Sequence, residues 1–119
     1  MRPCASVKTG RRVSGLSTIG ALVMIIVEGT IRVADLEAAR PHMERMIAAS
    51  RAEPGCVDYA YAVDLLDLGL VRVSERWTDR AALEAHLRAP HLAAWRACWD
   101  AVGVSERSLR LYEADAEAF

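Results

Sequence analysis

Residues 57–77 read V-D-Y-A-Y-A-V-D-L-L-D-L-G-L-V-R-V-S-E-R-W, and the rest of the predicted fold follows from them. The first half alternates and places four larger side chains on one face: Val57, Tyr59, Tyr61 and Val63. After the turn-forming D-L-G at 67–69, a second alternation places Val71, Val73, Glu75 and Trp77 on one face. A period of two is typical of half-buried strands, so this stretch predicts two strands joined by a hairpin-like turn.

A strand and a helix precede this hairpin. The segment M-I-I-V-E-G-T-I-R-V at 24–33 passes from an apolar run into alternation, which predicts a strand with one better-buried side. Asp35 is a good N-cap, and apolar residues then recur at helical spacing until E-P-G at 53–55, so a helix is expected over residues 35–52. Pro41 removes a backbone hydrogen bond inside this helix. It predicts either a kink or a helix that becomes regular only after Arg40.

Further helices and a strand follow the hairpin. Thr78 or Asp79 caps a second helix, whose inward residues are Leu83, His86 and Leu87. Pro90 opens a third helix, which Gly103 ends and which carries Leu92, Trp95, Trp99 and Val102. Residues 108–113, S-L-R-L-Y-E, form the last predicted strand.

The order strand, helix, strand, strand, helices, strand predicts an α+β, ferredoxin-like βαββαβ domain with a four-stranded antiparallel sheet and its helices on one face. The other sheet face is then uncovered. If it carries Ala60, Ala62, Leu70 or the tyrosines, a second copy would cover it, so we expect a homodimer whose sheets close into a dimeric α+β barrel. A one-residue register shift exchanges the faces of a strand, so the sequence does not fix which alternation meets the helices.

Length, charge and cysteine content restrict the class of protein. A chain of 119 residues is long enough for one domain. A charged fraction of 26% with a net charge of −1 gives no field that would attract nucleic acid or a membrane, so neither partner is expected. The three cysteines, Cys4, Cys56 and Cys98, follow no zinc-like spacing. We interpret them as reduced thiols, which favours a cytoplasmic protein.

The beginning of the chain differs from the rest, and we expect a disordered basic tail at 1–21 in front of a folded domain at 22–119. The tail has four basic residues and no acid; without it, 11 arginines face 16 acids and the net charge is −5. Arg11, Arg12 and the apolar run at 19–27 have the outline of a secretion signal. No small-residue cleavage site follows, however, and cleavage there would remove the first strand. Met24 is an alternative translation start.

Three segments carry motifs: R-A-E-P-G-C-V-D-Y-A-Y at 51–61, V-R-V-S-E-R-W-T-D-R-A-A-L-E-A-H at 71–86, and A-P-H-L-A-A-W at 89–95. Together they resemble the antibiotic biosynthesis monooxygenase family, over about residues 24–113, in its quinol monooxygenase-like form. The resemblance implies the dimeric α+β barrel fold. It also implies oxidation of quinols or anthrones by molecular oxygen without a metal or flavin cofactor, although other relatives degrade haem or isomerise small sugar-derived signals.

The candidate catalytic residues are His86, Trp77 and Glu75. Trp77 ends a strand and His86 lies in the next helix, so both are expected at the cleft between sheet and helices. A cofactor-free oxygenase needs only a base of near-neutral pKa and a dry apolar pocket, because the substrate supplies the electrons. His86 is therefore the candidate base, Trp77 a stacking wall, and Glu75 the acid that holds the His86 tautomer. Alternatively, His86 and Trp77 fill the core and Glu75 pairs with a surface arginine.

Tyr59, Tyr61 and His91 are the candidate substrate-binding residues. The tyrosines would equally line the barrel or the dimer interface, and His91 would equally pack at a helix start. His86 and His91 do not stack on one helix face, and no cysteine or acid completes a ligand set, so no metal site is expected. The chain has no G-x-G-x-x-G and no phosphate loop, so no dinucleotide cofactor is indicated.

Haem cleavage matches the sequence poorly. Haem-degrading relatives add an asparagine on the first strand to their tryptophan and histidine, and this chain has no asparagine. The expected function is a cofactor-independent monooxygenase that oxidises a small hydroxylated aromatic, a quinol or a polyketide-like compound, with molecular oxygen. Two alternatives stay open: an isomerase or tautomerase on the same scaffold, and a non-catalytic dimeric module that binds a small molecule.

Overall fold

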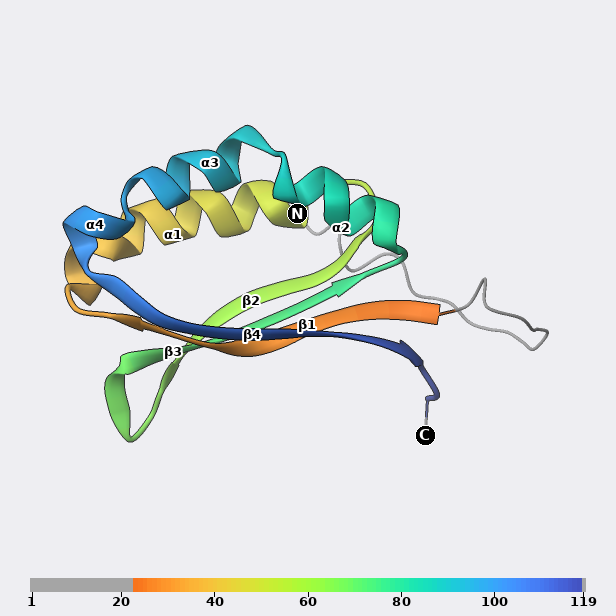
Figure 1. The fold of residues 1–119 in the computed structure, drawn as a ribbon, viewed down its shortest axis with the longest axis horizontal. Coiled ribbons are helices and arrows are strands. Elements are labelled where there is room, and N and C mark those ends of the chain that lie inside the picture. The colour runs from red at the N-terminus through yellow and green to blue at the C-terminus, as the bar shows by residue number, and fades with distance from the viewer. Residues whose placement is uncertain (1–22, 119) are drawn as a thin grey trace.

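The computed structural model describes residues 23–118, which form a four-stranded sheet and a layer of helices (Figure 1). In chain order, the elements are β1 (Val23–Val33), α1 (Leu36–Arg51), β2 (Cys56–Asp64), β3 (Asp67–Trp77), α2 (Arg80–Leu87), α3 (Pro90–Ala97), α4 (Trp99–Val102) and β4 (Val104–Asp115). The predicted ferredoxin-like βαββαβ arrangement is confirmed. The tail expected at 1–21 lies outside the described residues.

All neighbouring strands of the sheet are antiparallel, and their order is β2-β3-β1-β4. Because β3 lies between β1 and β2, which α1 connects, β1-α1-β2 is a split βαβ unit. β1 pairs with β3 from Ile25 opposite Trp77 to Arg32 opposite Leu70. The central position of β3 brings its last residues beneath the helices, whereas β4 forms one edge of the sheet.

The helix ends follow the expected capping. Asp35 and Asp79 each accept a hydrogen bond from a backbone N–H in the first turn of α1 and α2. α1 passes through Pro41 as one helix from Leu36, so the alternative of a regular helix only after Arg40 is wrong. Pro41 has no N–H to donate within the helix, so one backbone hydrogen bond of the first turns is missing. The Asp35 cap and the burial of Ala39 stabilise these turns.

The helix predicted from Pro90 to Val102 is divided in two. α3 and α4 meet at Cys98, and Gly103 ends α4 in the left-handed conformation at φ 73°. The last strand is longer than the predicted 108–113 because it pairs with β1 along most of its length. The break at Cys98 turns the chain toward the start of β4.

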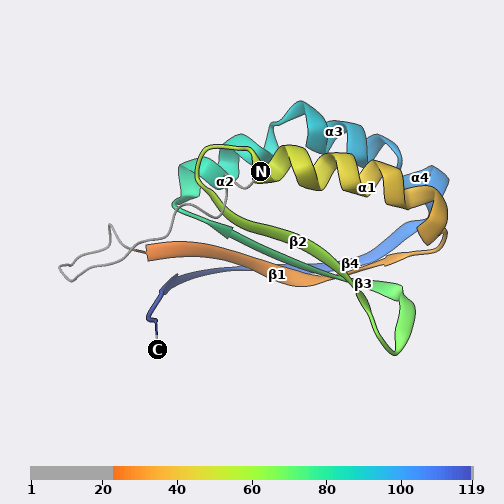
Figure 2. The ribbon, with the colours of Figure 1, turned by 180° about the vertical axis from the view of Figure 1, so that it is seen from behind.

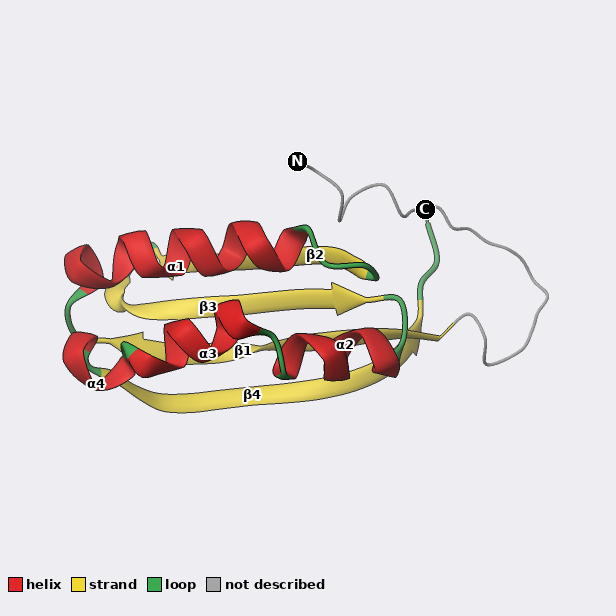
Figure 3. Ribbon diagram, turned by 90° about the horizontal axis from the view of Figure 1, so that it is seen from above, coloured by secondary structure: helices red, strands yellow, loops and turns green. Residues whose placement is uncertain are grey.

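The helices form a single layer on one face of the sheet (Figure 3). α1 lies over the β2 side, and α2 and α3 lie over the β1 and β4 side (Figure 3). The face that meets the helices carries the buried residues of the central strands: Ile25, Val27, Ile31 and Val33 of β1, and Val71, Val73, Glu75 and Trp77 of β3. Glu75 is thus an acid among apolar neighbours.

The outer face of the sheet is more polar than expected. Figure 2 shows that none of the helices within residues 23–118 covers it. Ala60, Ala62 and Leu70 belong to it, but Tyr59 and Tyr61 lie on the helix side. Between the small apolar residues stand charged ones: Glu28, Arg32, Asp58, Arg72, Arg76 and Arg110. The expectation of an apolar outer face is therefore wrong for the face as a whole, because charged residues alternate with the apolar ones along each strand.

The hairpin between β2 and β3 extends beyond the sheet (Figure 1). Three leucines at its tip are exposed to solvent, Leu65 by 90%, Leu66 by 93% and Leu68 by 69% of their surface.

Within residues 23–118, none of the helices is long and apolar enough to cross a lipid bilayer.

Candidate functional site

A cavity of about 200 Å³ lies between the inner face of the sheet and helices α2 and α3. Its apolar lining consists of Val27, Ile31, Leu83, Leu87, Leu92, Leu109 and Leu111. Its polar and aromatic lining includes Tyr59, Tyr61, Glu75, His86, Arg96, Trp99 and Arg107. An engineered apolar cavity of about 150 Å³ binds benzene, so this space accepts a small aromatic ring system.

His86 lies on the inward side of α2, where the Asp79 cap fixes the start of the helix. Its ring centroid is 4.8 Å from that of Trp77 and 5.1 Å from that of Tyr59. The Nδ1 atom is 2.9 Å from Oε2 of Glu53. The side chain is 1% exposed, and it lines the cavity, whereas Glu53 does not. The imidazole therefore lies between a carboxylate and the cavity.

Glu53 is the residue that the sequence-based analysis missed. It follows α1 in the E-P-G-C segment, which we had treated as a helix stop. The same Oε2 atom contacts Nε2 of His91, so one carboxylate holds two imidazoles. An ionised carboxylate only accepts hydrogen bonds, so Nδ1 of His86 carries its proton and Nε2 keeps its lone pair. The acid that holds the His86 tautomer is thus Glu53 and not Glu75.

Burial controls the protonation of His86. It lowers the pKa of the ring below its ordinary value, although the hydrogen bond to the Glu53 carboxylate opposes part of this change. The charges of His91 and Arg96 lower the pKa further. The ring is therefore predominantly neutral at pH 7 and can accept a proton at Nε2.

Glu75 is 6% exposed, lines the cavity, and accepts a hydrogen bond of 3.0 Å from Nε1 of Trp77. Burial raises the pKa of this carboxyl group to about 7, despite that hydrogen bond, which acts in the opposite direction. A carboxyl group with this pKa holds its proton in about half of the molecules at neutral pH. Glu75 can thus donate or accept a proton inside the cavity.

The two tyrosines and Trp77 occupy different positions relative to the cavity. Tyr59 and Tyr61 line it with ring centroids 5.9 Å apart, and burial raises the pKa of both phenols, so both remain neutral hydrogen-bonding groups. Trp77 is completely buried behind the lining and contacts His86. Its place is therefore that of a support for His86 and Glu75.

The donor atoms of Glu53, His86 and His91 lie within 4.8 Å of one another. The expectation that no acid joins the two histidines is therefore wrong, because the fold brings Glu53 to them from the end of α1. In the hydrogen-bonded arrangement, protons occupy the nitrogens that face the carboxylate, and a metal ion would have to displace them. His91 does not line the cavity, but it contacts Glu53 and its ring centroid lies 6.0 Å from that of His86.

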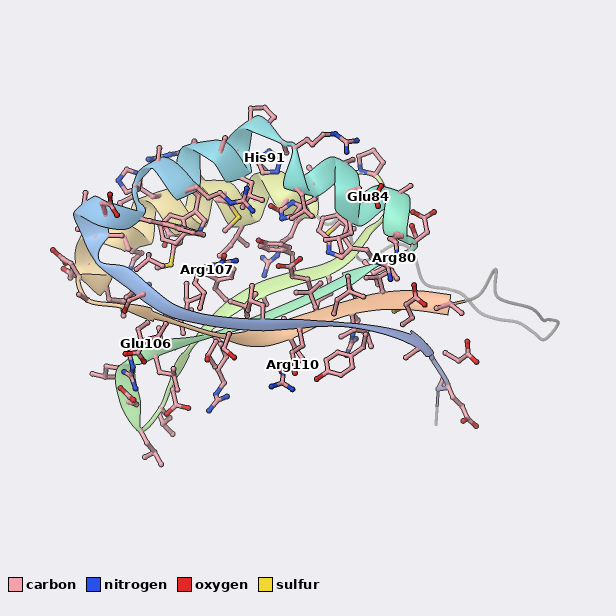
Figure 4. The ribbon with its side chains drawn as sticks, in the orientation of Figure 1. Arg80, Glu84, His91, Glu106, Arg107 and Arg110 are labelled. Carbon is pink, nitrogen blue, oxygen red and sulfur yellow. The ribbon has the colours of Figure 1, made fainter. Side chains whose placement is uncertain are left out.

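Three arginines that the sequence did not single out also belong to the lining, Arg96, Arg107 and Arg110. The Arg110 side chain points to the outer face of the sheet (Figure 4). Arg96 comes from α3, and Arg107 comes from β4 on the helix side of the sheet (Figure 4). The guanidinium carbon of Arg107 lies 4.8 Å from the centre of the Trp99 ring. Within residues 23–118, neither Arg96 nor Arg107 forms an ion pair with an acid.

Solved structures and a curated protein resemble this chain. A protein from Deinococcus radiodurans, assigned to the antibiotic biosynthesis monooxygenases, is 28% identical with a TM-score of 0.65 over 80% of this chain and 95% of its own. A conserved protein from Bacteroides thetaiotaomicron, 23% identical, shares the fold with a TM-score of 0.68 over 78% of this chain and 99% of its own.

Sequence comparison agrees with the structural likeness. The Synechocystis protein sll1783 is 34% identical over 74 residues, which are 60% of this chain; the match spans only 50% of that relative's length. A family model described as antibiotic biosynthesis monooxygenase matches residues 23–97, which include Glu53, Glu75 and His86. The match covers more than half of the 119 residues, and the fold agrees, so this chain belongs to the antibiotic biosynthesis monooxygenase family.

Proposed function

We propose that the cavity is the active site of a cofactor-independent monooxygenase that oxidises a small hydroxylated aromatic, such as a quinol, with molecular oxygen. The observation that carries the proposal is the position of His86, which lines the cavity while its Nδ1 contacts the Glu53 carboxylate. In this tautomer, Nε2 is a base oriented by a half-buried acid, the arrangement that activates hydroxyl groups in many enzymes.

The first step is removal of the phenolic proton by Nε2 of His86. The phenolate is electron-rich and transfers electrons to oxygen, forming a carbon–oxygen bond at a ring carbon that carries hydrogen, ortho or para to the oxygen. The neutral form of Glu75, favoured by its pKa of about 7, protonates the distal oxygen of the resulting peroxide. Mostly apolar walls keep water from competing for these protons.

Loss of water completes the reaction. The Glu75 carboxylate takes the hydrogen of the same ring carbon as a proton, the electron pair forms the new C=O bond, and the O–O bond breaks. The departing hydroxide receives the proton held on His86 and becomes water. A phenol and O₂ thus give a quinone and H₂O, with four electrons passing from the ring to oxygen and both side chains returned to their starting states.

Trp77, Tyr59 and Tyr61 support this chemistry in the proposal. Trp77 is a positioning residue, because it packs on His86 and donates to Glu75. Tyr59 and Tyr61 form part of the cavity wall and present aromatic surface to the substrate ring.

An oxygen electrode tests the proposal with a panel of monocyclic and bicyclic quinols and phenols. His86→Asn keeps a donor for Glu53 at the Nδ1 position and removes the base, so oxygen uptake should fall by about 100-fold or more. His42→Asn is the matched control, since His42 lies on α1 beside Arg45 and away from the cavity. Equal uptake by wild type and His86→Asn would eliminate His86 as the base. Product formed without oxygen consumption would instead favour an isomerase.

We also propose that two copies pair through the outer face of the sheet. Support comes from the apolar outer residues Met24, Ile26, Ala60 and Leu70, and from the exposed leucines at the hairpin tip. The charged residues of that face would then need partners across the pair, such as Glu28 with an arginine. Sedimentation equilibrium at micromolar concentration tests the dimer, and a monomer would contradict it.

A further inference from the structure

We infer that the substrate carries an anionic group, a carboxylate, which Arg107 and Arg96 bind in the same cavity that His86 and Glu75 line. The inference builds on the proposed function for the orientation of the substrate, with its hydroxyl group toward His86. The binding of a negative charge is inferred independently, from the two arginines and the residues around them.

Arg107 is the first part of this site. It precedes Leu109 and Leu111 on the same side of β4, and these three residues line the cavity along the edge strand. The guanidinium group lies over the Trp99 ring at 4.8 Å, which holds its plane in place through a cation–π contact. Its five N–H donors face no acid within residues 23–118. A positioned guanidinium without a carboxylate partner is suited to an anionic ligand.

Arg96 and Trp99 supply the second part from the helix side. With Leu92 they recur at helical spacing along α3 and α4, and all three line the cavity. Arg96 also lies close enough to His86 for its positive charge to lower the pKa of that imidazole. The indole Nε1 of Trp99 is buried and has no acceptor within the described residues. A carboxylate bound here would supply acceptors to both arginines.

The charges that line the cavity do not balance. The lining contains three arginines, Arg96, Arg107 and Arg110, whereas its one acid, Glu75, is about half neutral at pH 7. Glu53 does not line the cavity, and its carboxylate already accepts hydrogen bonds from His86 and His91. Arg96 and Arg107 are thus uncompensated by the cavity's own acid, and a substrate anion would balance them.

The volume of the cavity restricts the number of rings that the substrate can have. A volume of about 200 Å³ accepts one aromatic ring, or two fused rings, with a short acidic substituent. The three fused rings of an anthrone would fill this volume and leave no room for an acidic substituent inside it. The structure therefore favours a monocyclic or bicyclic hydroxyarene carboxylate over the polyketide-like alternative.

Calorimetric titration under nitrogen tests the inference without turnover. The probes are 2,5-dihydroxybenzoate and its neutral isostere 2,5-dihydroxybenzamide. Wild type should bind the acid about tenfold more tightly than the amide, and Arg107→Gln and Arg96→Gln should each reduce this preference to about twofold. Arg88→Gln is the matched control, because Arg88 is an exposed arginine at the end of α2 that does not line the cavity. It should keep the full preference.

The outcomes separate this inference from the proposed function. A preference for the acid that depends on Arg107 supports the inference even if no oxygen is consumed. Equal affinity for acid and amide, no binding of either probe by wild type, or a preference unchanged in both arginine variants would overturn it, even if quinols are oxidised. Thermal unfolding of each variant verifies the fold, and Arg107→Lys, which keeps the charge but loses the planar fork, should retain part of the preference.

Discussion

Nδ1 of His86 lies 2.9 Å from Oε2 of Glu53, although the two residues are 33 positions apart in the chain. The contact joins the end of α1 to the inner side of α2 and orients the ring toward the cavity. Through the same carboxylate, His91 is attached to the pair. The tautomer of the proposed base is thus set by a carboxylate that does not line the cavity.

Glu53→Ala removes the acceptor of His86 Nδ1–H. Because this donor is then buried without a partner, the free energy of unfolding should fall by about 1–3 kcal/mol, measured by urea denaturation. Oxygen uptake should fall by about 10- to 100-fold, as for other residues that orient a functional histidine. Glu84→Ala is a suitable control, since Glu84 is exposed on α2 (Figure 4). Unchanged activity in Glu53→Ala would contradict the orienting role.

Glu75→Gln should stabilise the protein at high pH but not at low pH. The pKa of Glu75 is raised from 4.5 to about 7 in the folded state, so its contribution to stability is fully present below pH 4.5 and is lost as the pH rises through 7. The difference in unfolding free energy between variant and wild type should therefore grow by at most about 3 kcal/mol over this range. Gln keeps an acceptor for Trp77. Urea denaturation at several pH values measures the difference; a difference independent of pH would rule out the raised pKa.

Gly29→Ala should disrupt the edge strand that carries Arg107. Gly29 has φ +158°, and a Cβ there would lie 1.9 Å from the carbonyl oxygen of Ser108 and 2.8 Å from Cα of Leu109. β4 would have to move away from β1, so we expect a loss of more than about 3 kcal/mol in stability. Gly69→Ala is the control, because its nearest contact would be 3.5 Å away. Thermal unfolding compares the two, and equal melting temperatures would argue against the close approach of β4.

Local sequence patterns were sufficient for the elements of the fold. The alternation in 57–77 predicted β2 and β3, and Asp35, Asp79 and Gly103 marked helix ends that the structure confirms. These features depend on neighbours in the chain. The polarity of the outer face was not predicted correctly, because it depends on the register of each strand, which a single sequence does not fix.

The candidate site could be predicted only in part. His86, Glu75, Tyr59 and Tyr61 line the cavity as expected, because they lie at inward positions of α2, β3 and β2. The partner of His86 could not be identified, since Glu53 reaches it through a tertiary contact that no spacing encodes. Arg107 was missed because the last strand was predicted to begin only at Ser108, whereas β4 begins at Val104. The sequence therefore placed this arginine in the connection before the strand.

The ionisation of a bound phenol under nitrogen tests the central claim most directly, namely that His86 takes a proton from the substrate hydroxyl. A cyanophenol that is neutral in solution at the working pH reports its own ionisation, because its ultraviolet absorption moves to longer wavelength in the phenolate. The account predicts a shift toward the phenolate spectrum when it binds to wild type or His42→Asn, because the imidazolium formed on His86 is stabilised by the Glu53 carboxylate and by the phenolate beside it. It predicts a neutral phenol spectrum with His86→Asn. A neutral spectrum with wild type, or a phenolate spectrum that persists in His86→Asn, would contradict the account.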